Sequence, residues 1–355
     1  MAEEPRGAGE SESLRGSRLF CRLECEVVTA IHRIEVPIPY PVKWVNCYYI
    51  EDSTPTLIDT GINTQESYEA LKAGIRKHGG SIKDIPRILV THGHVDHIGL
   101  AGRIGSAEIF VHSWDTVRAY APGGPLKEKM EDFRTFFSEA GVPPDTIPEL
   151  IELIVTRYKT FCSPLATAIP IHDRDVFTFD DFTLQAIHTP GHSPGSVSFF
   201  NEADGNIFSG DTLIPETVCN PTVEKGGSAR SDFNGLAEHY ESLNRIEALP
   251  VKRVLPGHGR TFRDHAIRIQ RIRTRHGKRR QEIVQILKNH GQTRTGGSAM
   301  TQFLLAQALY GLMSGIDVFF GISTVRGHLN LLHSQGLVSR LKQGQEYVFE
   351  LDIPL

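Results

Sequence analysis

One six-residue stretch constrains this chain more than any other feature of its sequence. Residues 92–97, HGHVDH, place three imidazoles and a carboxylate directly after an apolar, strand-like run. Side chains two positions apart project to the same side of extended backbone, so His92 and His94 can converge on one ion. Asp96 and His97 can then face a second ion. Nitrogen and oxygen donors of this kind suit zinc, and also iron or manganese.

Three further candidate ligands follow strand-like runs later in the chain. They are His192 in TPGHSPGS, Asp211 in FSGDT and His258 in LPGHG. The flanking glycines and prolines favour tight loops that present each side chain at the end of a sheet. Any one of them alone would be an ordinary turn residue. Together with the stretch at 92–97 they make seven donors, which is enough for two metal ions.

The order of these motifs, with LIDTG upstream at residues 57–61, resembles the metallo-β-lactamase-fold hydrolase superfamily, in particular its glyoxalase-II-like and lactonase-like members. The resemblance covers roughly residues 30–262. It implies an α/β fold, a four-layer αββα sandwich with the metals at one edge of two packed sheets. It also implies two sets of ligands, namely His92, His94 and His192 for the first metal and Asp96, His97 and His258 for the second. Asp211 would bridge the two metals, and Asp59 would orient ligands from behind.

The chemistry that the resemblance implies is hydrolysis by two divalent metal ions, with zinc expected and iron or manganese as alternatives. Two ions about 3.5 to 4 Å apart lower the pKa of a shared water, and the resulting bridging hydroxide attacks the substrate. Asp96 and Asp211 are the predicted catalytic residues, and no protein nucleophile is needed. Cys219 lies eight residues after Asp211, so the chain departs from β-lactamases that use a cysteine ligand.

Charge divides the chain into two parts. Residues 263–355 carry 13 Lys and Arg against 6 Asp and Glu, a net charge of +7, which leaves a net charge of −11 for residues 1–262. The change in composition predicts a domain boundary there. The predicted parts are a disordered tail (1–22), a catalytic domain (23–262) with a helical insertion (121–168), a basic linker (263–280) and a region of three helices and a hairpin that resembles a winged helix (281–355).

Substrate choice does not follow from the metals, since one such centre serves many bond types. The insertion has apolar residues at helical spacing, which would cap the site with an apolar wall or simply pack as helices: Phe133, Phe136, Phe137, Leu150, Ile154 and Tyr158. A wall would favour a small acyl substrate such as a thioester or lactone. Lys225 and Arg230 could hold a carboxylate or phosphate, although a solvated loop explains them equally well.

The main alternative is an endoribonuclease or another phosphodiester hydrolase that uses the basic linker and the winged helix. The candidate recognition helix at 323–334 opposes it, because it offers only Arg326 and two histidines and its leucines suggest packing. The acidic catalytic part also repels a polyanion. A small-molecule hydrolase is therefore the preferred prediction, nucleic acid the second choice and a non-catalytic sensor the third.

Five scattered cysteines, odd in number, argue against a disulfide framework and for a reducing, cytoplasmic location. Cys21 and Cys25 could form a metal pair, but no second Cys or His pair lies nearby. The N-terminus lacks the apolar segment of a secretory signal, and no apolar run is long enough to span a membrane. We therefore expect no membrane partner, and a homodimer is left open.

Overall fold

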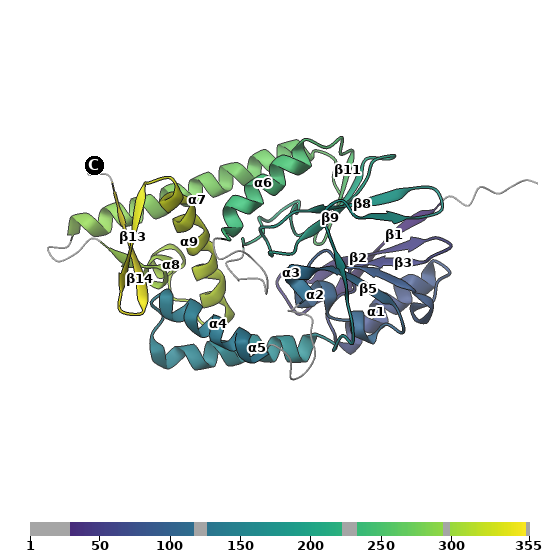
Figure 1. Ribbon diagram of the computed structural model, residues 1–355, viewed down its shortest axis with the longest axis horizontal. Helices are drawn as coiled ribbons and strands as arrows, with labels where there is room; N and C mark the ends of the chain where they lie inside the picture. Colours follow the sequence, from purple (N-terminus) through teal and green to yellow (C-terminus); the bar gives the residue numbers. More distant parts are fainter. Residues whose placement is uncertain (1–28, 117–125, 222–232, 294–298, 353–355) are drawn as a thin grey trace, which may run out of the picture.

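Two β-sheets packed face to face form the larger part of the protein (Figure 1). The structure, a computed structural model, describes residues 29–116, 126–221, 233–293 and 299–352. Within these residues, the strand order is β1-β2-β3-β4-β5-β6 in the first sheet and β11-β10-β9-β8-β7 in the second. The first sheet consists of β1 (Ala30–Pro37), β2 (Trp44–Glu51), β3 (Thr56–Ile58), β4 (Arg87–Leu89), β5 (Glu108–His112) and β6 (Ile169–Ile171). The second consists of β7 (Val176–Thr178), β8 (Thr183–His188), β9 (Val197–Asn201), β10 (Asn206–Gly210) and β11 (Arg253–Pro256).

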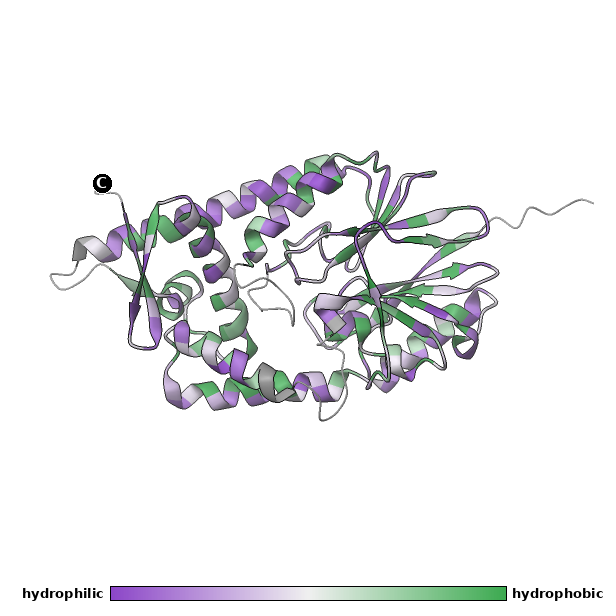
Figure 2. Ribbon diagram, viewed as in Figure 1, coloured by the Kyte–Doolittle hydropathy of each residue, from purple (hydrophilic) through white to green (hydrophobic). Residues whose placement is uncertain are grey.

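The space between the sheets is filled by apolar side chains from both. Tyr48 and Leu89 of the first sheet pack with Phe199, Phe208 and Leu255 of the second. The rings of Tyr48 and Phe208 meet edge to face with their centres 5.0 Å apart. Figure 2 shows the same pattern, with hydrophobic residues concentrated along the strands of both sheets. This burial holds the ends of β4, β9, β10 and β11 at fixed positions.

A helix covers the outer face of each sheet. On the first sheet, α1 (Gln65–Lys77) buries Leu71 and Ile75. This helix begins after Thr64, whose Oγ1 accepts a hydrogen bond from the backbone N–H of Ser67. On the second sheet, α6 (Gly235–Glu247) buries its own apolar residues against β10 and β11. The four layers that the resemblance implies are therefore present.

The shorter helices lie mainly between the strands of the first sheet. They are α2 (Val95–Ile98), α3 (Ser113–Thr116) and the 3-10 turns at Ile82–Asp84, Ala101–Arg103 and Pro144–Thr146. Two of them, α2 and α3, are the next elements along the chain after β4 and β5. They therefore lie at the carboxyl ends of parallel strands, where α/β folds place their ligands.

One long helix, α7 (His265–Thr293), joins the sandwich to the C-terminal region (Figure 1). Its first half buries Ile269 and Ile272 against the second sheet, and its second half buries Ile283 and Leu287 in another core. The segment 263–280, predicted as a linker, lies largely within this helix. A continuous helix is stiff, so it fixes the C-terminal region relative to the sandwich.

The C-terminal region is a small unit of helices and a three-stranded sheet. It contains β12 (Met300–Thr301), α8 (Gln302–Tyr310), α9 (Ile316–Ser334), β13 (Val338–Gln343) and β14 (Glu346–Leu351), with the strands in the order β12-β14-β13. The hairpin of β13 and β14 turns at Gly344, whose φ of 62° suits glycine. Among the described residues, no helix has the length and apolar character to cross a membrane.

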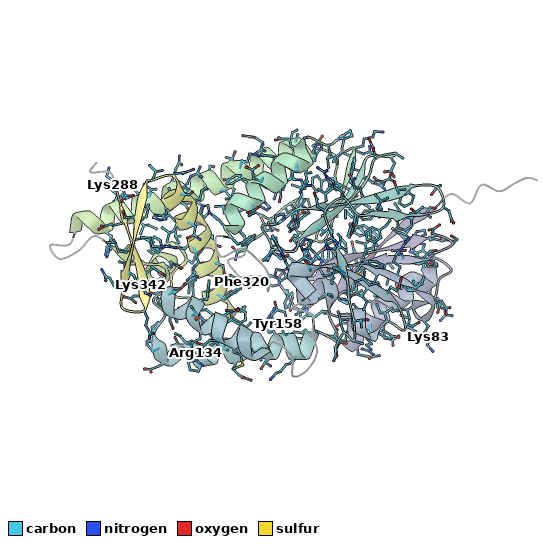
Figure 3. All side chains as sticks on the ribbon, viewed as in Figure 1. Lys83, Arg134, Tyr158, Lys288, Phe320 and Lys342 are labelled. Atoms are coloured by element: carbon cyan, nitrogen blue, oxygen red, sulfur yellow. The ribbon has the colours of Figure 1, made fainter. Side chains whose placement is uncertain are left out.

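The helical insertion, α4 (Leu126–Glu139) and α5 (Ile147–Phe161), packs on the C-terminal region. Its aromatic and aliphatic side chains share one core with α8, α9 and β14, so of the two alternatives these buried residues follow helix packing and not an apolar wall over the metal site: Phe133, Phe136, Phe137, Leu150 and Ile154. The ring of Phe133 lies 5.9 Å from that of Phe319 on α9. Tyr158, half-buried and labelled in Figure 3, packs against both this core and the core of the first sheet.

Candidate metal centre

The structure brings all seven predicted ligands together at one edge of the sandwich. Four of them belong to the loop and short helix after β4, and the others follow β8, β10 and β11. They form three overlapping groups whose ligand atoms lie within 4.8 Å of one another: His92, His94 and His192; His92, His97 and Asp211; and Asp96, His97 and His258. Strands far apart in sequence therefore end at the same place.

The first group is formed by three imidazole nitrogens. The Nδ1 atom of His94 lies 2.9 Å from Nε2 of His92 and 2.9 Å from Nε2 of His192. One nitrogen carries at most one proton, so a proton on His94 can satisfy only one of these two neighbours. A shared cation would satisfy all three, which is the usual reason that imidazole nitrogens converge.

The second group mixes imidazole with carboxylate. His258 Nε2 lies 3.3 Å from Oδ2 of Asp96 and 3.6 Å from Oδ2 of Asp211. His97 Nε2 lies 3.5 Å from Oδ1 of Asp211, whose Oδ2 is also 3.4 Å from Nε2 of His192. Asp211 thus lies between the two groups, as a bridging ligand would.

Two orphaned atoms test whether a metal fits this arrangement. His97 Nε2 and Asp211 Oδ1 are both buried and have no hydrogen-bond partner. Buried polar atoms are normally paired, and an unpaired one is costly. A divalent cation between them would be bound by both atoms, so the residues present fit a metal of the zinc type.

The pKa values of Asp96 and His258 also favour a cation at the site. Burial alone would raise the pKa of Asp96, but His97 and His258 hold it well below its usual value. Burial would lower the pKa of His258, yet Asp211 and Asp96 outweigh it and raise that pKa to about 10. The Asp96 carboxylate therefore stays negative and favours positive charge beside it.

Asp59 supports the second group from behind. Its carboxylate accepts hydrogen bonds from the backbone N–H and the hydroxyl of Thr91, both at 2.8 Å, and from Nδ1 of His97 at 2.8 Å. Because a carboxylate only accepts, His97 must carry a proton on Nδ1, which directs its Nε2 at the group. Asp59 itself has a φ of 61°, a conformation that is uncommon outside glycine.

Backbone carbonyls orient two further imidazoles in the same way. His258 Nδ1 donates to the carbonyl of Trp44 at 2.8 Å, and His192 Nδ1 donates to the carbonyl of Asn220 at 3.1 Å. A carbonyl cannot donate, so each ring carries a proton on Nδ1 and directs its Nε2 at the site, where a bound metal would take the place of any proton on Nε2. The sequence did not reveal either partner, since neither stands near its histidine in the chain.

Asp115 is a site residue that sequence reasoning missed. From α3, its carboxylate accepts hydrogen bonds from the N–H of Gly93 at 2.8 Å, the hydroxyl of Ser193 at 2.6 Å and the N–H of Gly195 at 3.0 Å. It therefore ties the loop of His94 to the loop of His192. Its only sequence signal is an Asp shortly after a strand, which is too common to single it out.

Several other predicted features lie apart from the ligand groups or outside the described residues. Cys219 is buried beside His239, with Sγ 3.6 Å from Nδ1, and belongs to none of the ligand groups. The tail at 1–22, the Cys21 and Cys25 pair, Lys225 and Arg230 fall outside the described residues.

A sequence profile of the metallo-beta-lactamase superfamily matches residues 42–258, a span that includes all seven candidate ligands. The chain belongs to this superfamily. A Bacillus subtilis member described as a probable metallo-hydrolase, YqjP, is 26% identical over 320 residues, 89% of this chain and 96% of its own length. An atrochrysone carboxyl ACP thioesterase of Aspergillus fumigatus is 27% identical over 198 residues, 54% of this chain and 58% of its own length.

Most of this chain has the same fold as solved structures. A metallo-beta-lactamase family protein of Thermus thermophilus, TTHA1429, superimposes with a TM-score of 0.74 and 24% identity, covering 90% of this chain and 98% of its own. Family membership and the His and Asp donor groups together confirm the prediction of a metallo-hydrolase.

Proposed function

We propose that this superfamily member hydrolyses an ester-type bond, a thioester or a lactone, in a small acyl substrate. The observation that carries the proposal is Asp211, which lies within 3.6 Å of imidazole nitrogens in both donor groups. That placement supports a binuclear site, with zinc favoured for its nitrogen and oxygen donors and iron or manganese as alternatives. When bound, two divalent ions would supply a water of lowered pKa and polarise the scissile carbonyl.

The chain's own residues support water as the nucleophile. Cys219 is the described cysteine nearest in sequence to a ligand motif, and burial raises the pKa of its thiol far above the ordinary value. A thiol in that state is a poor nucleophile. Asp96 remains ionised beside the imidazoles. With Asp211, which lies 3.6 Å from Nε2 of His258, it would hold the proton-accepting side of the site. The two aspartates therefore keep their predicted catalytic role in this proposal.

A small acyl substrate is favoured over a nucleic acid by the packing of α9. In the winged-helix interpretation, which the order α7, β12, α8, α9 and hairpin supports, α9 would be the recognition helix. Its Arg326 is instead half-buried, with 13% of its side chain exposed, and it donates to the carbonyl of Phe136 at 2.9 Å and to Oε1 of Gln302 at 2.6 Å. We infer that the C-terminal region serves packing rather than nucleic-acid recognition. The thioesterase named above agrees with an acyl substrate.

Phosphodiester hydrolysis is a second candidate because of one observation on α7. Arg271, Arg275 and Lys278 line a shallow surface hollow of about 580 Å³. A row of cations at helical spacing can follow a phosphate backbone. This surface would bind a polyanion even though α9 cannot present Arg326.

The deciding experiment compares substrate classes on one metal-loaded preparation. Short-chain and aromatic acyl thioesters and γ-lactones would be assayed beside labelled single-stranded RNA, for the wild type and for His94→Ala. Ester hydrolysis that His94→Ala abolishes would support the proposal. RNA cleavage that His94→Ala abolishes, without any ester turnover, would replace it by the second candidate.

A further inference from the structure

The loop at 219–221 connects the candidate metal centre to the C-terminal region. The backbone carbonyl of Asn220 accepts the 3.1 Å hydrogen bond from Nδ1 of His192. The side chain of the same residue reaches in the other direction, to α9. Its Nδ2 donates to the carbonyl of Phe320 at 3.1 Å, and its Oδ1 accepts from the hydroxyl of Thr324 at 2.7 Å. One residue therefore contacts a metal-ligand candidate and a helix about 100 positions later.

The side chain of Asn220 is held in a defined orientation. A carbonyl oxygen such as that of Phe320 only accepts, so the amide nitrogen must face it, and the amide oxygen then faces Thr324. The Thr324 hydroxyl also lies 3.0 Å from the Phe320 carbonyl, but it has one proton and its shorter contact is to Asn220. Figure 3 labels Phe320 on the side of α9 that faces the sandwich.

The helix that receives these bonds is itself held rigidly. Two residues beyond Thr324, Arg326 binds the insertion through the carbonyl of Phe136. On another side, the ring of His328 lies 5.6 Å from that of His276 on α7. Since α9 is buried against α5, α6, α7 and α8, it offers a firm anchor for the loop.

The same side of the centre is supported by α6. Ser242 donates to the carbonyl of Pro190 at 2.7 Å, and Gly191 has its φ at 142°. A Cβ added to Gly191 would lie 2.5 Å from Cβ of His239, so the ligand loop lies directly against α6. The remaining freedom of the His192 ring is rotation about its own side-chain bonds. The Asn220 carbonyl limits that rotation.

We propose that Asn220 and Thr324 act as a clamp through which helix α9 positions His192, so that the C-terminal region is a working part of the first metal group. The proposal rests on the proposed function, because it takes His192 to be a metal ligand. Asn220 and Thr324 are positioning residues and touch neither metal nor substrate. Partners of this kind commonly change metal affinity by 10- to 100-fold, and one step further from the metal we expect about 3- to 10-fold.

The test uses the full-length chain with Thr324→Val, Thr324→Ser and Asn220→Ala. Valine keeps the shape of threonine but cannot donate to Oδ1 of Asn220, whereas serine keeps the hydroxyl. A matched control is Thr274→Val on α7, because Thr274 makes the same kind of bond to the carbonyl four residues earlier, Gln270, at 2.9 Å. It is exposed and lies in α7, away from the loop at 219–221.

Two measurements that do not depend on turnover read out the clamp. Apparent Kd values for zinc come from competition with a chromophoric chelator, and the visible absorption of the cobalt-loaded protein reports ligand geometry. We expect Thr324→Val and Asn220→Ala to weaken the tighter or the weaker binding step by about 3- to 10-fold and to shift the cobalt spectrum. Thr324→Ser and Thr274→Val should match the wild type. Circular dichroism and thermal unfolding confirm that each variant is folded.

The outcomes separate the clamp from the proposed function. Folded Thr324→Val and Asn220→Ala proteins with wild-type zinc affinities and cobalt spectra would overturn the clamp while leaving the hydrolase proposal intact. A wild-type protein that binds no divalent metal would overturn both. An equal effect of Thr324→Val and Thr274→Val would also overturn it, because a general loss of helix stability would then explain the change.

Discussion

Replacing Asp59 by asparagine changes the metal centre without changing its shape. The carboxylate accepts three hydrogen bonds, from the N–H and hydroxyl of Thr91 and from Nδ1 of His97. Asparagine offers one accepting oxygen and an NH₂ group. If the NH₂ group faces Thr91 N–H, two donors oppose each other. If it faces His97, the imidazole must move its proton to Nε2, the atom that points into the ligand group.

The expected magnitude follows from this conflict of donors. Loss of a carboxylate that orients a ligating histidine lowers metal affinity by about 10- to 100-fold, or roughly 1.4 to 2.7 kcal/mol. The effect should fall on the second metal group, because His97 belongs to the groups with Asp211, Asp96 and His258. The first group of His92, His94 and His192 should retain its affinity.

The assay is a chelator competition that resolves two binding steps in the Asp59→Asn protein. A matched control is Asp145→Asn, the same chemical change on an exposed turn of the insertion. We expect one step to weaken and the other to stay at its wild-type value, with the control unchanged at both. A folded Asp59→Asn protein with two wild-type affinities would refute the role of Asp59 in setting the His97 tautomer.

Three further outcomes can be measured on the same protein. Asp211→Ala should abolish hydrolysis while circular dichroism shows the fold retained, and residual activity near the wild-type level would contradict a bridging role. Arg326→Met should lower the free energy of unfolding by about 3 kcal/mol, because charged hydrogen bonds to buried partners are lost. The same variant should bind RNA with unchanged affinity in a filter-binding assay. Weaker RNA binding by the folded variant would instead support α9 as a recognition helix. Burial, with His276, Arg280 and Arg279 nearby, lowers the pKa of His328 to about 3, so unfolded chains take up this proton below about pH 6.5 and folded ones do not. The contribution of His328 to the free energy of unfolding is therefore fully present above pH 6.5 and falls on acidification, by about 2 kcal/mol between pH 7 and 5. In urea unfolding, the His328→Leu protein should lack this part of the decline. A pH dependence equal to that of the wild type would contradict the lowered pKa of His328.

The convergence of the candidate ligands was largely predictable because these residues lie in short motifs. The six residues at 92–97 contain four donors, and the flanking glycines mark His192, Asp211 and His258 as loop residues. Such motifs are local, since the chemistry needs particular atoms at particular spacings. The structure then gathers the seven side chains into three overlapping groups of neighbouring ligand atoms.

The supporting residues were not predictable for the opposite reason. Asp115 bonds to Gly93 and Gly195, which are 22 and 80 positions away. Asn220 reaches Thr324 across 104 positions. Contacts of this kind depend on how strands and helices are arranged in space, and no periodicity in the chain encodes them.

The sequence by itself determined the donor set, the α/β character of the sandwich and the amphipathic helices of the insertion. Only the tertiary structure decided what those helices pack against. Helical periodicity shows that a face such as that of Phe133 and Phe137 will be buried, but apolar burial is non-directional and does not name its partner. The partner is the C-terminal region, whose core these residues share. That choice turns Arg326 toward the insertion, where it donates to the carbonyl of Phe136, and sets α9 against the loop beside His192.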